Sequence, residues 1–219
     1  MTARYNGLAD WYDVRYVVGA PRHLPSLPEL LGPGSGPCLD LGCGTGRNFD
    51  TIRDSGRTVV GVDCSADQLR LARTRTDGPL IEADAAVLPF ADGSFDAVIA
   101  MWISTDLEDF AGALGEAARV LRTGGRLVCY GVHPSFNGPH VEWNEDGSRL
   151  VHPTYRTAGW HEPAPWWGDD GIRRQVGMRH VPLPELLNAF LRPELTVEHI
   201  EEPGDMPVPH ALAIKARRN

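Results

Sequence analysis

The stretch CLDLGCGTGRN, from Cys38 to Asn48, is the part of the chain that decides its fold. It joins a short apolar run to three glycines at every second position, and the acid Asp40 stands just before them. A glycine-rich loop after a strand indicates that the backbone comes very close to another group. The candidates for that group are a dinucleotide, a phosphate and a ligand that carries no phosphate.

Outward from this loop, apolar strands alternate with amphipathic helices. Strands are expected at 38–41, 58–63, 79–84 and 95–102, after the glycine pair at 124–125, at 195–202 and at 210–218. Helices are expected at 47–56, 65–75, between Thr105 and the glycine pair, and at 182–191. The segment 95–102 has the continuous apolar run of a strand covered on both faces. This alternation is typical of a doubly wound α/β sheet with right-handed connections and helices on both faces.

Local signals mark the ends of two of these helices. Ser65 and Gln68 have the spacing of a capping box, in which each side chain hydrogen-bonds to the backbone N–H of the other residue. Thr105 and Glu108 have the same spacing. The glycine pair at 124–125 is expected to end the second helix before the next strand begins.

The composition indicates one domain, or one domain with an insertion. The chain has 219 residues, of which 42% are hydrophobic and 23% charged, and its net charge is -8. This charge argues against general binding of nucleic acid or of an anionic membrane surface. No apolar run has the length of a membrane span and no signal peptide is visible, so a cytoplasmic location is expected. Four cysteines without a C-x-x-C pair predict reduced core thiols.

The regular pattern stops between His133 and His180. This stretch is rich in Pro, Gly, Trp and His, shows no sustained period, and is too long for a plain connection. We therefore expect a functional insertion or lid. The resulting plan has an N-terminal cap and linker at 1–36, a ligand-binding core at 37–132, a substrate-facing insertion at 133–181, and a helix with the last two strands at 182–219.

The glycine loop departs from two phosphate-binding motifs. A dinucleotide fingerprint needs G-x-G-x-x-G, and here Arg47 occupies the place of the last glycine. A P-loop needs G-K-[ST], which is missing. Asp40 would repel a pyrophosphate, whereas it would suit a ligand with a cationic amino group. The loop therefore favours a ligand without phosphate.

Two further acids stand where predicted strands end. Asp63 ends the second strand, where a carboxylate can accept hydrogen bonds from both ribose hydroxyls. Asp84 ends the third, where an acid can accept a bond from the N6 amine of adenine. The alternative for each is a helix or turn cap, as Asp often forms. Together with Asp40 they match a ligand that carries an amino acid, a ribose and an adenine, S-adenosylmethionine (SAM).

The same region resembles a known family, the class I SAM-dependent methyltransferases of the small type 11 kind. LDLGCGTGRN matches its motif I, VVGVDCSADQL its motif II, EADAAVLPFADGSFDAVIA the third-to-fourth-strand signature, and ALGEAARVLRTGGRLV the next helix and strand. The matches run in order from Cys38 to Tyr130, and YNGLADWYD near the N-terminus looks like the family's cap over the cofactor. The resemblance implies a mostly parallel seven-stranded sheet of the Rossmann-like methyltransferase fold, with an insertion after the fifth strand.

The resemblance also implies which residues contact SAM and its product S-adenosylhomocysteine. Asp40 and Gly42 would face the methionine end, Asp63 the ribose, and Asp84 with the Ala85 amide the adenine. With neighbouring motif and cap positions, the expected cofactor-binding set is Tyr12, Asp40, Gly42, Gly44, Gly46, Asp63, Cys64, Asp84, Ala85 and Met101. The chain departs from the family after the fourth strand, where STDLED replaces the usual His-Asp pair.

The methyl acceptor is expected to be a small, aromatic or heterocyclic metabolite. The place of the [DNS]-P-P-[YFW] motif of amino methyltransferases reads AMWIS, and the double-glutamate signature of protein arginine methyltransferases is missing. Tryptophans of the insertion either stack on a flat acceptor or build a small core of their own. By the resemblance, His133 and His180 match acceptor-facing histidines and are the predicted catalytic residues, His133 first. No metal site is expected, because the histidines lack regular ligand spacing.

Methyl transfer from SAM needs mainly in-line positioning, with a base where the acceptor carries a proton. The predicted function is therefore O-, N- or C-methylation of a small molecule, with no nucleic-acid or membrane partner, by a monomer or homodimer. One alternative is a non-catalytic SAM-binding sensor or partner subunit, which would keep the three acids. The other is an NAD-dependent oxidoreductase, which Asp40 and the missing last glycine disfavour.

Overall fold

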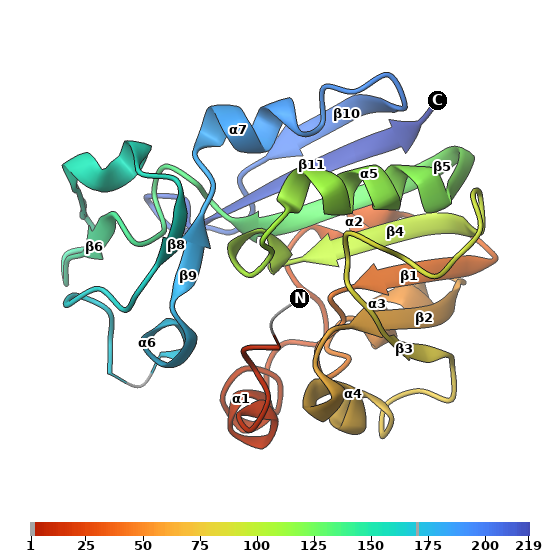
Figure 1. Cartoon of the computed structure of the whole chain (residues 1–219), viewed down its shortest axis with the longest axis horizontal. Coiled ribbons are helices and arrows are strands. Elements are labelled where there is room, and N and C mark those ends of the chain that lie inside the picture. The colour runs from red at the N-terminus through yellow and green to blue at the C-terminus, as the bar shows by residue number, and fades with distance from the viewer. Residues whose placement is uncertain (1–2, 170) are drawn as a thin grey trace.

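The computed structural model describes residues 3–169 and 171–219, and its centre is a seven-stranded sheet (Figure 1). In sheet order the strands are β10 (Leu195–Glu201), β11 (Ala211–Arg218), β5 (Leu121–Val132), β4 (Phe95–Met101), β1 (Pro37–Leu41), β2 (Thr58–Asp63) and β3 (Leu80–Glu82). β1 to β5 run parallel, whereas β11 is antiparallel to both of its neighbours. The mostly parallel seven-stranded sheet expected from the sequence is confirmed.

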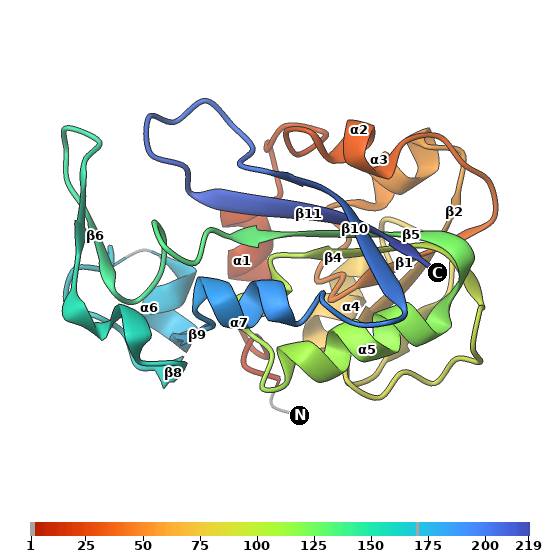
Figure 2. The same cartoon turned by 90° about the horizontal axis from the view of Figure 1, so that it is seen from above.

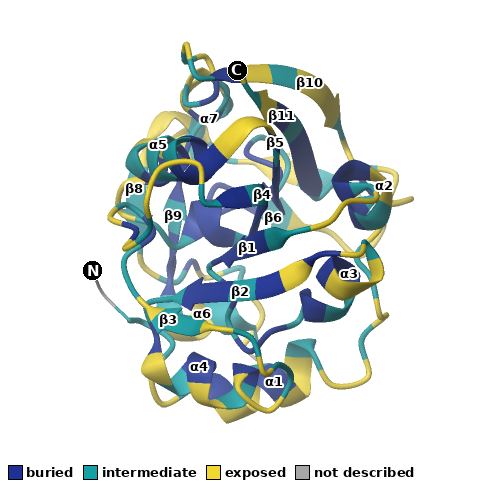
Figure 3. Cartoon of the chain, turned by 90° about the vertical axis from the view of Figure 1, so that its right-hand side faces the viewer, coloured by how far each residue is buried: buried dark blue, intermediate teal, exposed yellow. Residues whose placement is uncertain are grey.

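Helices cover both faces of this sheet (Figure 2). One face carries α5 (Phe110–Val120) and α7 (Leu183–Asn188), and the other carries α2 (Leu27–Leu31), α3 (Phe49–Asp54) and α4 (Ala66–Ala72). Successive strand residues point to opposite faces, so Val98 belongs to the first core and Ile99 to the second. The central strands are accordingly buried on both sides, as the dark blue strands in Figure 3 show.

Helix α5 has the expected apolar face but not the expected ends. Phe110 and Leu114 are buried on it, and burial of a large apolar side chain contributes about 1.5–3 kcal/mol. The helix begins after Asp109, whose side chain accepts a hydrogen bond from Gly112 N–H at 2.7 Å. The predicted start at Thr105 was wrong, because that residue ends a short 3-10 turn, η1 (Ile103–Thr105).

The predicted end of α5 at the glycine pair was also wrong. The helix ends at Val120 and β5 begins at the next residue. The pairing register with β4 then shifts, since Phe95 faces Leu121 and Ala97 faces Arg126. Gly124 has φ 77° within this irregular part of the strand. Its conformational freedom therefore serves a bulge in β5 rather than the end of a helix.

Half of the capping box predicted at α4 is present. Ser65 accepts a hydrogen bond from Gln68 N–H at 3.2 Å. The Gln68 side chain does not return a bond, because Asp63 Oδ1 already accepts the Ser65 N–H at 2.9 Å. The start of α4 is thus fixed by its cap and by the acid that ends β2.

The chain between β5 and α7 forms an insertion beyond the carboxyl ends of the parallel strands (Figures 1 and 2). It contains two small antiparallel sheets, β6 (Val141–Trp143) with β7 (Arg149–Val151) and β8 (Gly159–His161) with β9 (Met178–His180). A 3-10 turn, η2 (Pro153–Arg156), and the short helix α6 (Ile172–Val176) complete it. Three-residue strands are too short to give a recognisable period-2 pattern, which explains the irregular sequence.

The N-terminal segment crosses the edge of the sheet at which the parallel strands end. Its helix α1 (Ala9–Tyr16) lies beside α4, as Figure 3 shows. Gly7 N–H donates to Asp67 Oδ2 at 2.9 Å, and the Ser65 hydroxyl donates to Asn6 Oδ1 at 2.6 Å. Polar contacts therefore hold this cap against the helix that follows Asp63.

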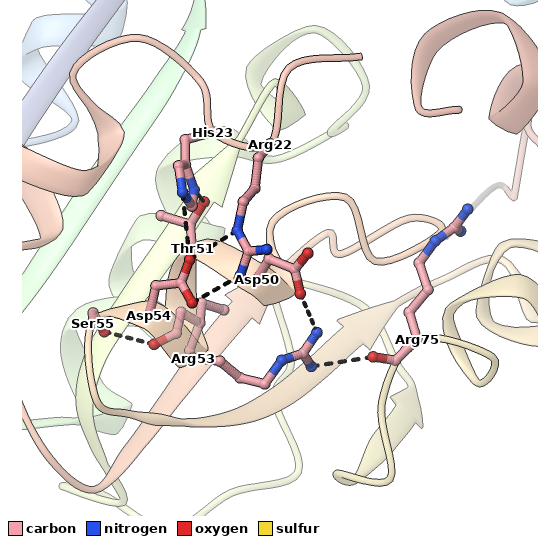
Figure 4. Close-up of polar contacts among 9 residues, drawn as sticks. Arg22, His23, Asp50, Thr51, Arg53, Asp54, Ser55 and Arg75 are labelled. Atoms are coloured by element: carbon pink, nitrogen blue, oxygen red, sulfur yellow. Dashed lines mark hydrogen bonds and ion pairs between the residues drawn. The ribbon is translucent and has the colours of Figure 1, made fainter. Parts of the chain in front are cut away.

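The linker after α1 is fastened to the outer side of α3 (Figure 4). Arg22 donates two hydrogen bonds to the Asp54 carboxylate at 3.0 and 2.9 Å. His23 Nδ1 lies 2.9 Å from Thr51 Oγ1. These contacts are exposed or partly so and each is worth little alone, but together they fix the path from the cap to α2.

Within the described residues, no helix is both long and apolar enough to cross a bilayer.

Candidate functional site

The loop after β1 has the geometry that only glycine adopts freely. Gly42, Gly44 and Gly46 have φ values of 72°, 54° and 87°. A side chain on Gly42 would overlap Ile103, and one on Gly46 would overlap Phe49. The three glycines are therefore required by the tight turn and by the side chains packed around it.

The N–H groups of this loop are used inside the protein. Gly42 and Cys43 both donate to Val62 O, at 2.8 and 2.9 Å, and Gly44 donates to Asp63 Oδ2 at 2.8 Å. A phosphate cradle needs several free N–H groups that converge on the anion. These three are already paired, so the loop is shaped to lie against a ligand rather than to bind a phosphate.

A large cavity of about 870 Å³ lies at the carboxyl ends of the parallel strands. It reaches from Asp84, after β3, to His210, just before β11. These two strands are five positions apart in the sheet, a span of about 24 Å at the usual strand spacing. Between them the chain crosses over from β3 to β4, so the cavity lies at the topological switch point at which open α/β sheets bind ligands.

Most of the predicted cofactor-binding residues line this cavity. Those that do are Tyr12, Gly42, Gly44, Asp63, Cys64, Asp84, Ala85 and Met101. Two do not: Gly46 faces Phe49, and Asp40 lies behind the loop with no exposed surface. Asp40 is thus absent from the lining of the cavity, whereas the sequence predicted that it faces the amino group of the ligand.

Asp40 is an unusual buried acid. Neither of its carboxylate oxygens has a hydrogen-bond partner among the described residues. Burial raises its pKa to about 7, although the nearby Asn48 side chain opposes the rise. The side chain therefore titrates near neutral pH, although it does not line the cavity.

Asp63 and Asp84 are both turn caps and cavity-lining acids. Asp63 accepts the Ser65 N–H through Oδ1 and the Gly44 N–H through Oδ2, while burial raises its pKa. Asp84 Oδ1 accepts the Ala86 N–H at 2.9 Å. Each carboxylate oxygen has two lone pairs, so a backbone bond orients the group and leaves capacity for a ligand hydroxyl or amine. The two roles weighed from the sequence are compatible.

The two predicted catalytic histidines do not line the large cavity. His133 is 4% exposed, its Nε2 lies 2.9 Å from Glu202 Oε1, and burial lowers its pKa. His180 is 3% exposed and its Nε2 lies 2.7 Å from Tyr155 O. The chain turns at the end of β5 and directs the His133 ring toward the loop after β10. The structure therefore does not bring this pair to the site.

Several other side chains that line the cavity were missed from the sequence. Among them are His210, Trp102 and Arg173. Trp102 has φ 63°, a left-handed conformation that is a genuine outlier for so large a residue, and such strain gathers at functional sites. His210 reaches the cavity because β11 runs antiparallel to β5 and so begins at the edge where the parallel strands end.

Arg173, from α6, closes the insertion over the cavity. It donates to both Asp106 oxygens, at 2.6 and 2.9 Å, and to Thr105 Oγ1 at 2.8 Å. Tyr5 from the N-terminal cap donates to the same carboxylate at 3.1 Å. Asp106 thus joins the cap and the insertion, and the coulombic attraction of Asp106 raises the pKa of Arg173 despite its burial.

Helix α1 is tied to the glycine loop from the other side. Asp13 accepts a hydrogen bond from Thr45 Oγ1 at 2.6 Å and forms an ion pair with Arg75 at 2.7 Å. Burial would raise the pKa of Asp13, but these bonds outweigh it and lower the pKa. In the part of the chain that the structure describes, no cluster of three potential metal ligands is present.

Comparison with known proteins relates the part of the chain that carries this site to a protein family. A model described as a methyltransferase domain matches residues 39–129, which run from β1 to β5 and include the glycine loop, Asp63 and Asp84. The chain carries a methyltransferase domain. The family resemblance and the fold class expected from the sequence are thereby confirmed.

This methyltransferase domain is similar to parts of two demethylmenaquinone methyltransferases. That of Tropheryma whipplei is 39% identical over 114 residues, which cover 48% of this chain and 46% of the relative. That of Corynebacterium urealyticum is 43% identical over 98 residues, which cover 45% of this chain and 42% of the relative. The chain therefore matches less than half the length of each.

A solved structure extends the similarity to nearly the whole chain. It is the S-adenosylmethionine-dependent methyltransferase from Mesorhizobium loti, with a TM-score of 0.68 and 25% sequence identity. The superposition covers 97% of this chain and 99% of that one. The methyltransferase domain, the N-terminal cap and the insertion thus form one fold that recurs in another protein.

Proposed function

We propose that this chain binds SAM in the large cavity and transfers its methyl group to a small molecule. The observation that carries the proposal is that the glycine loop, Asp63 and Asp84 line one cavity of about 870 Å³. A cavity of this size suits a small ligand and its co-substrate together. The methyltransferase domain and its SAM-dependent structural relative support the same reading.

The residues of the cavity fit an adenosyl ligand better than a dinucleotide. The N–H groups of Gly42 and Gly44 are paired internally, so they do not contribute to a cradle for a pyrophosphate. Asp63 and Asp84 offer carboxylate oxygens to hydroxyl and amine donors, and their charge suits a cationic ligand. When bound there, SAM would supply an electrophilic methyl group, while the chain's own residues orient the acceptor and exclude water.

The acceptor is proposed to be an aromatic or heterocyclic small molecule. The cavity continues past β4 to the ends of β5 and β11, where its walls include Trp102, Trp143 and Trp166. Aromatic walls favour flat ligands, because stacked or edge-to-face rings gain more than the area they bury. The names of the two sequence relatives say that they act on demethylmenaquinone, a small molecule, which agrees with this class.

Calorimetric titration with SAM and S-adenosylhomocysteine tests the cofactor part. We expect Asp63→Ala and Asp84→Ala each to weaken binding about ten-fold or more, since a hydrogen bond to a charged group is worth about 1.5–3 kcal/mol. Asp50→Ala is the matched control, because this acid pairs with Arg53 on the outer side of α3. Absence of SAM binding by the wild type, or equal affinities in all variants, would refute the assignment.

Mass spectrometry of a panel of phenols and heterocyclic amines incubated with SAM tests the transfer itself. A mass gain of one methyl group in a panel member, with equal release of S-adenosylhomocysteine, is the expected result. Tight SAM binding without turnover on any member would instead favour the non-catalytic SAM-binding protein.

A further inference from the structure

His210 is the one histidine among the described residues that lines the large cavity. It precedes Ala211, which pairs with Val132 at the end of β5, and the neighbouring pair on β5 and β4 is Tyr130 with Met101. His210 therefore lies beside the end of β5, on the side of the sheet away from β2 and β3, the strands that Asp63 and Asp84 end or follow. This is the side left for the methyl acceptor if SAM occupies the other.

Aromatic side chains fix the His210 ring in this position. The Trp102 ring is nearly parallel to it, with an interplanar angle of 20° and a centroid distance of 6.3 Å. The Trp143 ring meets it edge-on at 6.4 Å. The backbone is held as well, since His210 O accepts hydrogen bonds from His133 N–H and from the Asn137 side chain. The strained Trp102 thus serves as a wall for the imidazole.

The surroundings of His210 favour the neutral form of its imidazole. Its Nδ1 is buried and has no hydrogen-bond partner among the described residues. Burial lowers the pKa of His210, and the positive charge of Arg149 lowers it further. Arg149 lies with its guanidinium 3.7 Å from the centre of the Trp143 ring. Both effects act in the same direction, so the neutral form of His210 prevails at neutral pH. The acid Glu202 pairs with His133.

We propose that the region around His210, Trp102 and Trp143 binds a planar aromatic acceptor with an ionisable hydroxyl, and that His210 takes the proton of that hydroxyl. This inference rests on the proposed function. The acceptor oxygen forms a bond to the methyl carbon while the carbon–sulfur bond breaks and its electron pair stays on sulfur. The hydroxyl proton passes to the His210 imidazole, which later releases it to water. One proton is thereby freed for each methyl group transferred.

Binding of 4-nitrophenol to protein saturated with S-adenosylhomocysteine tests this without turnover. In calorimetric titrations from about pH 5 to about pH 9, the affinity for 4-nitrophenol should be highest at pH values between the pKa of His210 and that of the phenol. In this range the imidazole and the phenol together carry one proton, which they share in a hydrogen bond. His210→Asn should lower the maximum affinity about ten-fold, because one hydrogen bond in a charged or proton-sharing pair is lost. It should also remove the acidic limb, the decrease in affinity at low pH. In SAM turnover, the same variant should lower kcat about a hundred-fold.

Two comparison variants decide between the histidines. His199→Asn, on the exposed side of β10, should leave the binding profile unchanged. If His133→Asn removes the acidic limb and His210→Asn does not, the proton acceptor is His133 and the proposal is wrong. A wild type that fails to bind 4-nitrophenol at any pH also overturns it. Failure of the SAM titration would refute the proposed function instead. Because the two titrations use different ligands, the two failures can be told apart.

Discussion

At the level of single residues, the glycine loop owes its shape to the protein and not to a ligand. Gly42 and Gly44 have positive φ and donate their N–H groups to Val62 and Asp63. The Gly42 Cα also lies so close to Ile103 that a side chain would overlap it. A loop held in this way is organised before the ligand arrives, which lowers the entropy cost of binding.

Gly42→Ala should therefore destabilise the protein by more than the cost of a left-handed backbone conformation at Ala. A left-handed Ala costs about 1–2 kcal/mol, and the overlap with Ile103 adds about 1–3 kcal/mol. Gly124→Ala is the matched control, because Gly124 has φ 77° and no atom near its missing side chain. Urea unfolding of both variants measures the difference, and equal losses of stability would show that Ile103 yields without cost.

At the level of elements, the cavity is closed by two segments that are far apart in the sequence. The N-terminal cap contributes Tyr5 and the insertion contributes Arg173, and both bind the carboxylate of Asp106 after β4. Tyr16 Oη also accepts a hydrogen bond from Ile172 N–H at 2.9 Å. The two segments are thus coupled through shared partners, and loosening one should loosen the other.

Arg173→Ala tests this coupling. Loss of its charged hydrogen bonds removes about 1.5 kcal/mol or more, so backbone amides near Arg173 and near Tyr5 should exchange roughly ten-fold faster with deuterium. Arg174→Ala is the control, since the contacts of Arg174 with the exposed Asp169 and with Ala164 O are both long, at 3.5 Å. Faster exchange confined to the insertion would contradict coupling of the cap and the insertion through Asp106.

The sequence predicted the elements of the central sheet well because those strands carry long apolar runs. It also predicted that Asp63 and Asp84 meet, since the carboxyl ends of parallel strands lie at one edge. It could not place His210, because that needs the position and direction of β11, which are set by contacts with β5. The same holds for Arg173, whose partner Asp106 is 67 positions away. His133 was misplaced because a local motif does not say which way a ring turns.

For the whole molecule, buried ionisable groups make stability depend on pH in two opposite directions. Burial raises the pKa of Asp40 to about 7, so its contribution to stability is lost as pH rises through that value. Burial lowers the pKa of His133, His180 and His210, and of His140 to about 4. The folded state binds fewer protons than the unfolded state at these histidines, so their effect is a loss of stability as pH falls.

His140 should contribute most to the loss at acidic pH. It has no exposed surface, both ring nitrogens lack a hydrogen-bond partner among the described residues, and the His180 ring is 4.4 Å away. Its folded pKa of about 4 lies below the ordinary 6.5, so the unfolded chain takes up the proton first between these values. Stability is then full above about pH 6.5, falls as pH drops, and levels off near pH 4.

His140→Leu removes this titration and replaces the ring by an apolar side chain of similar volume. At pH 5 the wild type pays a proton-linked penalty of about 2 kcal/mol that the variant lacks. On lowering the pH from 7.5 to 5, the free energy of unfolding of the variant should therefore rise by about this much relative to that of the wild type. Urea unfolding at both pH values measures the difference. Because Asp40 titrates in both proteins, its opposite trend cancels in the difference. Parallel pH profiles would mean that His140 takes up a proton in the folded protein as readily as in the unfolded chain.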